Sequence, residues 1–103
     1  MFVHMAIHYP KPEYSGEVLA SMQRVDQAAQ GSPGLIEIGA WRDERSGRLI
    51  GLARWESAEA FQASVERIFS AVADDPFDLW FQQPPDVFHL TQPDNETAPD
   101  RSR

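Results

Sequence analysis

Three stretches of the chain are rich in apolar strand-forming residues and predict β-strands, and two sets of side chains alternate along the first of them. The first stretch runs from Phe2 to Tyr9 and ends at the prolines that follow. The second and third cover residues 35–42 and 48–55. A short polar loop containing Gly47 separates them, which is typical of a β-hairpin. A short closing strand is predicted at residues 87–90.

Two other stretches repeat apolar residues at helical spacing. The first covers residues 13–30. We expect its polar side chains, Asp26 among them, on the face away from the core. Its apolar positions are Val18, Met22, Val25 and Ala29. The second helix starts near Ser57, a residue type that caps helix N-termini well. Its apolar stripe consists of Phe61, Val65, Ile68, Phe69 and Val72. Residues 77–86 are predicted as an aromatic connection that starts with a helical turn.

The order of these elements, βαββαβ, is that of a ferredoxin-like α+β sandwich, in which two helices lie on one face of an antiparallel sheet. The length of 103 residues fits one domain, which we place at residues 1–91. Residues 92–103 are polar and contain proline, so we expect a disordered C-terminal tail there.

The second and third strands are apolar on both faces, whereas a sheet with one solvated face should alternate with polar residues. Two helices can cover one face, and nothing left in the chain covers the other. We therefore expect a homodimer packed sheet to sheet about a two-fold axis. The alternative is a monomer with a partly apolar open face.

Composition narrows the choice of partners. The formal net charge is −7 with no run of basic residues, which argues against nucleic acid and against an anionic membrane surface. The chain has no cysteine, so disulfides, thiolate metal ligands and cysteine nucleophiles are excluded. No apolar run reaches the ~18–20 residues of a membrane helix, and the N-terminus does not resemble a signal peptide. A cytoplasmic location is the default expectation.

Two segments carry a family resemblance. The run L-A-R-W-E-S-A-E-A-F at residues 52–61 resembles the aromatic-x-Ser-x-Glu-Ala-Phe pattern of antibiotic biosynthesis monooxygenase (ABM)-like domains. The turn S-P-G-L-I at residues 32–36 resembles their Pro-Gly-Leu turn into the second strand. The resemblance implies a dimeric α/β barrel. It also implies activities found in the family: oxidation of polycyclic aromatic or quinol substrates without metal or flavin, or haem degradation.

The chain departs from the family pattern in ways that bear on haem. Family members often carry a histidine just after the Glu-Ala-Phe run, where this chain has Ser64. Haem-degrading members use an asparagine, a tryptophan and a helical histidine. Here the only asparagine is Asn95, in the predicted tail, and both predicted helices lack histidine. We therefore expect no cofactor, with haem binding kept as a third hypothesis.

Histidine is the strongest candidate for chemistry. His4 and His8 are four residues apart on a strand, which separates their Cα atoms by roughly 13 Å, so they cannot share a metal ion unaided. With three histidines and no cysteine, no metal site is predicted. His8, near the end of its strand, is our candidate for a catalytic general base, because histidine titrates near neutral pH.

Five further residues are candidates for substrate binding: Trp41, Arg54, Trp55, Phe81 and His89. Aromatic side chains at strand ends and in the connection can wall a pocket for a flat apolar ligand, or can serve as ordinary core and dimer interface. Arg54 interrupts an apolar strand. It can neutralise an enolate oxygen in a pocket or pair with Glu37 across the sheet, and we favour the pair.

These observations favour a small homodimeric ABM-like protein that binds an aromatic or quinol-type small molecule and oxidises it without a cofactor. The alternative is a non-catalytic dimeric ligand-binding or accessory module of the same fold, because fold does not fix function.

Overall fold

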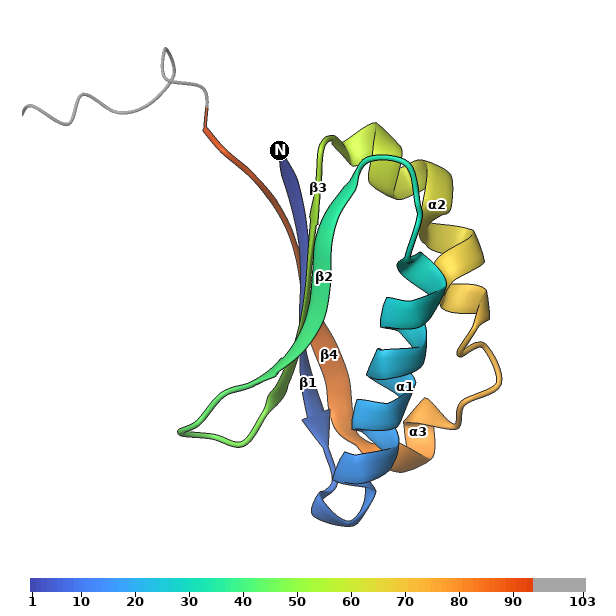
Figure 1. Cartoon of the computed structure of the whole chain (residues 1–103). Coiled ribbons are helices and arrows are strands. Elements are labelled where there is room, and N and C mark those ends of the chain that lie inside the picture. The colour runs from blue at the N-terminus through green and yellow to red at the C-terminus, as the bar shows by residue number, and fades with distance from the viewer. Residues whose placement is uncertain (94–103) are drawn as a thin grey trace, which may run out of the picture.

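The computed structural model of the chain describes residues 1–93 (Figure 1). Its elements are β1 (Phe2–Pro10), the 3₁₀ turn η1 (Pro12–Tyr14), α1 (Ser15–Ala29), β2 (Leu35–Arg42), β3 (Leu49–Trp55), α2 (Ala58–Ser70), α3 (Phe77–Trp80) and β4 (Phe81–Thr91). The predicted ferredoxin-like α+β fold is confirmed, including the helical turn at the start of the aromatic connection. All but the first two residues of the predicted tail at 92–103 lie outside the described part of the chain.

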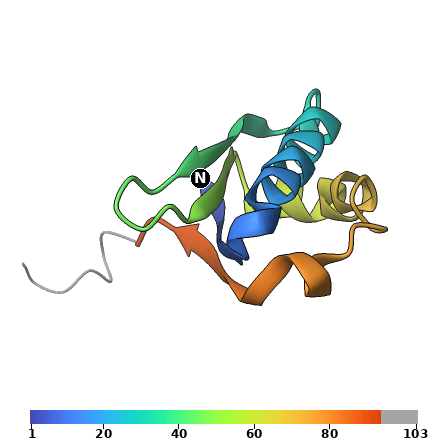
Figure 2. The ribbon, with the colours of Figure 1, turned by 90° about the horizontal axis from the view of Figure 1, so that it is seen from below.

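The four strands form one antiparallel sheet in the order β2-β3-β1-β4. The helices α1, α2 and α3 lie on the same side of this sheet, and α1 and α2 run along it (Figures 1 and 2). The opposite side carries no helix from residues 1–93. Because side chains alternate between faces, each strand has one row toward the helices and one row away from them.

The prediction for the last strand was too short. We expected residues 87–90, and β4 begins at Phe81 and includes Pro84 and Pro85. A proline has no N–H to give to a strand ladder, and this usually argues against a strand. Here β4 is an edge strand beside β1 only, and its pairing with β1 shifts register between Ile7 and Tyr9. The prolines fall in this irregular part of an edge, where missing donors cost little.

Trp55 sits at the corner where β3 turns into α2, and it is only 1% exposed. Its ring lies 5.9 Å from that of Phe61, edge to face, within the larger of two core clusters. The Ser57 side chain accepts a hydrogen bond from the backbone N–H of Ala60 at 3.1 Å, which confirms the predicted helix cap. The corner is therefore fixed by a buried ring and a capped helix.

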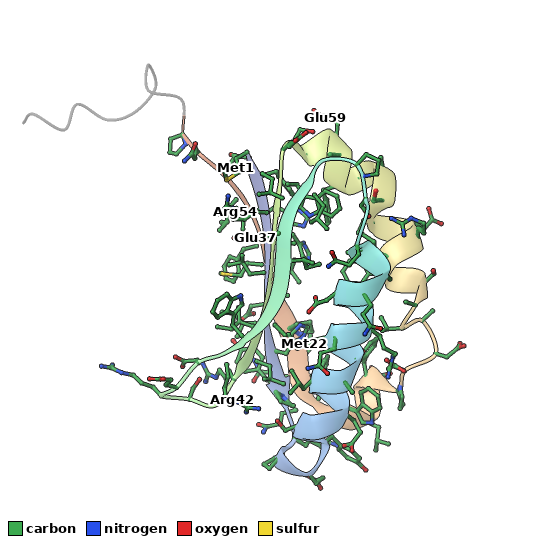
Figure 3. All side chains as sticks on the ribbon, viewed as in Figure 1. Met1, Met22, Glu37, Arg42, Arg54 and Glu59 are labelled. Atoms are coloured by element: carbon green, nitrogen blue, oxygen red, sulfur yellow. The ribbon has the colours of Figure 1, made fainter. Side chains whose placement is uncertain are left out.

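The sheet face away from the helices carries a charged pair within apolar surroundings. Arg54 and Glu37 are directly opposite each other in the β2–β3 register, and their side chains meet at 3.1 Å, as predicted (Figure 3). The same register places Trp41 on this face, where it is 63% exposed.

None of the helices within residues 1–93 combines the length and the apolar character that a membrane crossing requires.

Candidate functional site

A cavity of about 580 Å³ lies between the sheet and the helices. This volume is within the range of roughly 300–1,000 Å³ that ligand pockets occupy. Its walls come from β1 and β3 on one side, from α1 and α2 on the other, and from α3 and the start of β4. Most of the lining is aliphatic or aromatic, with a few polar side chains among it.

The floor of the cavity is open because its strands carry small residues there. Ala6 and Gly51 are register partners on β1 and β3, and both line the cavity. A Cβ atom added at Gly51 would lie 3.5 Å from Cε of Met22 on α1 and 3.9 Å from Nε2 of His8. Figure 3 shows Met22 on the side of α1 that faces the sheet. Because Gly51 has no side chain, the space between Met22 and His8 stays open.

Strand alternation brings His4 and His8 to the same side of β1, and both line the cavity. His4 is paired in register with His89 on β4, and their ring nitrogens Nδ1 and Nε2 lie 3.1 Å apart. The His4 ring also stacks on Phe61 at 5.0 Å. Burial, followed by the positive charges that His89 and His8 can carry, lowers the pKa of His4 to about 4. His4 is therefore neutral at pH 7.

His8 lies near the C-terminal end of β1, and its ring centroid is 5.4 Å from that of Phe81. Burial lowers the pKa of His8 below its ordinary value of 6.5, so this histidine is also neutral at pH 7. Its Nδ1 is buried and has no hydrogen-bond partner among the described residues, and the same holds for Nε1 of Trp55. A neutral imidazole with Nε2 near the open floor at Gly51 can accept a proton from a bound molecule.

The sequence profile of the antibiotic biosynthesis monooxygenase family matches residues 1–67, about two-thirds of the chain. The chain belongs to this family. No curated protein sequence matches it.

Solved structures agree with this ABM membership at the level of the fold. A Mycobacterium tuberculosis protein is 15% identical with a TM-score of 0.75, over 93% of this chain and 98% of its own. A candidate antibiotic biosynthesis monooxygenase from Nitrosomonas europaea is 13% identical with a TM-score of 0.72, over 89% and 98%. The haem degrader MhuD from Mycobacterium tuberculosis, solved with two haems in its active site, is 20% identical with a TM-score of 0.67, over 87% and 93%.

The side chains of this ABM cavity do not suit haem. Haem brings two anionic propionates, which need cationic or strongly donating partners. The described cavity lining contains Asp26 and Asp78 and no lysine or arginine. Nδ1 of His4 already lies 3.1 Å from Nε2 of His89. Within residues 1–93, no three side chains of metal-ligating types gather at one point.

Three of the six predicted site residues of this ABM chain lie together. His8, Trp55 and Phe81 all line the cavity. His89 is outside the lining but touches His4 from the neighbouring strand. Trp41 and Arg54 do not line the cavity, because the strand register turns them to the opposite face of the sheet.

Asp26 is a cavity residue that the sequence pattern assigned to the wrong face of its helix. Half-buried on α1, it lines the cavity beside Ser21 and Met22. Burial raises the pKa of its carboxyl above the ordinary value. The helical spacing indicated this position, since Asp26 follows Met22 by four residues and so lies one turn along the same face. The rule that charged residues face solvent outweighed this spacing.

Proposed function

We propose that this ABM-family chain is a cofactor-independent monooxygenase for a flat aromatic or quinol-type substrate, with His8 as the general base. The observation that carries the proposal is the largely apolar cavity of about 580 Å³, lined by a neutral histidine whose Nδ1 has no hydrogen-bond partner among the described residues. A substrate whose carbanion or enolate is delocalised over fused rings reacts with O₂ by itself once deprotonated. The protein then needs to supply a base, a shaped dry site and stabilisation of the developing oxyanion.

The reaction balances without a reductant. A ring CH₂ group that is conjugated with a carbonyl through the fused rings loses a proton to His8, and its C–H bonding electrons form the enolate. The enolate gives one electron to O₂, and the resulting radical pair closes a C–O bond to form a peroxide. The peroxide takes back the proton, and loss of water breaks the O–O bond and the second C–H bond. The products are a ring carbonyl and one water.

The burial of His8 fits this role. A low pKa keeps the imidazole neutral and able to accept a proton at pH 7. Once protonated, the imidazolium lies beside the enolate that it has just created, and this ion pair offsets the cost of a buried charge. Arg54 lies on the other face of the sheet, so we assign oxyanion stabilisation to His8 itself and to the side-chain amide of Gln83, which also lines the cavity.

We further propose that the chain acts as a homodimer packed through its sheet faces. Support comes from the side of the sheet that no described helix covers, where Trp41, Phe88 and Leu90 remain exposed. Several large apolar side chains exposed on one face are typical of a surface that another protein covers.

Oxygen consumption with anthrone tests the oxygenase proposal, with anthraquinone absorbance as the product readout. The wild type is expected to exceed the buffer background, and His8→Gln is expected to lose roughly a hundredfold or more in rate, the scale of general-base catalysis. His4→Gln is the matched control, because it removes the other cavity histidine and should keep most of the rate. A wild type that never exceeds background, or a His8→Gln variant as active as wild type, contradicts the proposal.

A non-catalytic binding module is the second candidate. It is favoured by the described cavity lining, which offers no lysine or arginine to an oxyanion. Calorimetry with anthrone under nitrogen separates the two candidates. Binding by the wild type without oxygen uptake in air would identify the module, and binding with uptake that depends on His8 would identify the enzyme. Gly51→Val, which fills the floor between Met22 and His8, should weaken binding in either case.

A further inference from the structure

The acidic side chains that line the cavity have no basic side chain beside them in the described lining. Its described lining holds two carboxyl side chains, Asp26 and Asp78, and no lysine or arginine. The two histidines that line it are neutral at pH 7, so they do not balance this charge. A ligand that carries a carboxylate or phosphate would therefore meet repulsion and find no cationic partner. Neutral ligands and hydrogen-bond donors meet no such penalty.

Asp26 differs from Asp78 in its surroundings. Asp78 is exposed near the cavity rim, whereas Asp26 is half-buried among Met22 and Val25 of its own helix. Within residues 1–93 the Asp26 carboxylate takes part in no ion pair and accepts no side-chain hydrogen bond. Gln30 bonds the backbone carbonyl of Asp26 and leaves the carboxylate free. Partial burial removes some of the water around this carboxylate, and a donor from a ligand would offset that loss.

We propose that Asp26 is a specificity-determining residue that accepts a hydrogen bond from a phenolic hydroxyl of a neutral, flat aromatic ligand. The proposal rests on the cavity being the ligand site of the proposed function, and it names the class of ligand that the cavity takes.

The positions of the walls support this assignment. Asp26 lies on α1, and His8 lies on β1 across the cavity. A fused-ring ligand lying between helix and sheet can therefore place a hydroxyl against Asp26 while another part of the ring system faces His8. Ser21, buried on α1 and also lining the cavity, adds a neutral donor and acceptor to the helix wall. Hydroxylated rings fit this wall, and their methyl ethers and carboxylates do not.

The test uses three probes that share one ring system and do not react with oxygen under the assay conditions: 2-naphthol, 2-methoxynaphthalene and 2-naphthoate. Calorimetry with the wild-type chain should show 2-naphthol binding roughly tenfold or more tighter than either of the others, the scale of a hydrogen bond to a charged group. Asp26→Asn removes the charge at nearly constant volume. In this variant the preference for naphthol over the ether should shrink severalfold, and naphthoate should bind more tightly than it does to the wild type.

Asp78→Asn is the matched control, because it removes an equal charge from the exposed rim and should keep the wild-type order of affinities. Unchanged near-ultraviolet circular dichroism confirms that each variant is folded. Equal affinity of the wild type for naphthol and the ether overturns the proposal, and so does an Asp26→Asn variant with wild-type selectivity. Because these measurements need no turnover, a chain that selects naphthol through Asp26 but consumes no oxygen would contradict the oxygenase proposal alone.

Discussion

Gly34 lies so close to the side chain of Ala60 that position 34 has no room for a larger residue. A Cβ atom built on Gly34 would lie 2.6 Å from Cβ of Ala60, far inside ordinary contact. Gly34 also has φ of +84°, and its carbonyl accepts a hydrogen bond from the backbone N–H of Glu56 at 2.8 Å. The Pro-Gly-Leu turn and the Ser-Ala-Glu-Ala-Phe run are thus two sides of one contact. What marks the family in this sequence is a packed corner beside the cavity.

Replacing Gly34 by alanine should destabilise the fold strongly. The positive φ costs an L-residue roughly 1–2 kcal/mol, and overpacking against Ala60 adds about 1–3 kcal/mol. We expect a loss of about 2–5 kcal/mol in the free energy of unfolding, measured by urea denaturation. Gly31→Ala is the control, since Gly31 also has positive φ, at +79°, but nothing lies within 4 Å of an added Cβ. A Gly34→Ala loss no larger than that of Gly31→Ala would show that the contact with Ala60 is unimportant.

Stability should fall as the pH is lowered from 7 toward 5, because of the buried histidines. The folded pKa of His4 is about 4, below the ordinary 6.5 of an unfolded chain. As the pH falls through 6.5, His4 takes up a proton in the unfolded chain but stays neutral in the folded chain. Acid therefore favours unfolding down to about pH 4. His8, whose pKa is also lowered by burial, acts in the same direction. Thermal unfolding at closely spaced pH values would record this slope.

His4→Gln isolates the contribution of His4. Glutamine can still hydrogen-bond toward His89 but does not titrate, so the variant should show a flatter fall in melting temperature between pH 7 and pH 5. The double variant His4→Gln/His8→Gln should be flatter again. If the single variant keeps the full wild-type slope, His4 does not carry a lowered pKa in the folded protein.

Most of the fold could be predicted because local patterns and tertiary structure agree. The alternation along residues 2–9, the Gly47 loop and the Ser57 cap each specify an element that the structure contains. The last strand was underestimated because Pro84 and Pro85 argue locally against a strand, and only the edge position of β4 makes them acceptable. An edge position is a property of strand order, which no local window of sequence contains.

The site was harder to predict than the fold, because a residue's face depends on long-range register. His8 and Trp55 could be assigned to one face by alternation and by the corner motif, and both line the cavity. Trp41 and Arg54 are equally conspicuous in sequence, but pairing between β2 and β3 places them on the other face. Asp26 is the opposite case. Its charge predicted a solvent-facing position, but it lies in the cavity wall, as its four-residue spacing from Met22 indicates.

The open sheet face gives the last prediction, a homodimer that Trp41 helps to hold together. Sedimentation of the wild type at micromolar concentration should give twice the 11.6 kDa chain mass. Trp41→Arg should shift it to the monomer, because the arginine places an unpaired charge in an apolar interface. Leu79→Arg is the control: Leu79 is 49% exposed on α3, on the helix side, and its variant should stay dimeric. A monomeric wild type, or a Trp41→Arg variant as dimeric as Leu79→Arg, would show that the apolar face is not an interface between copies of this chain.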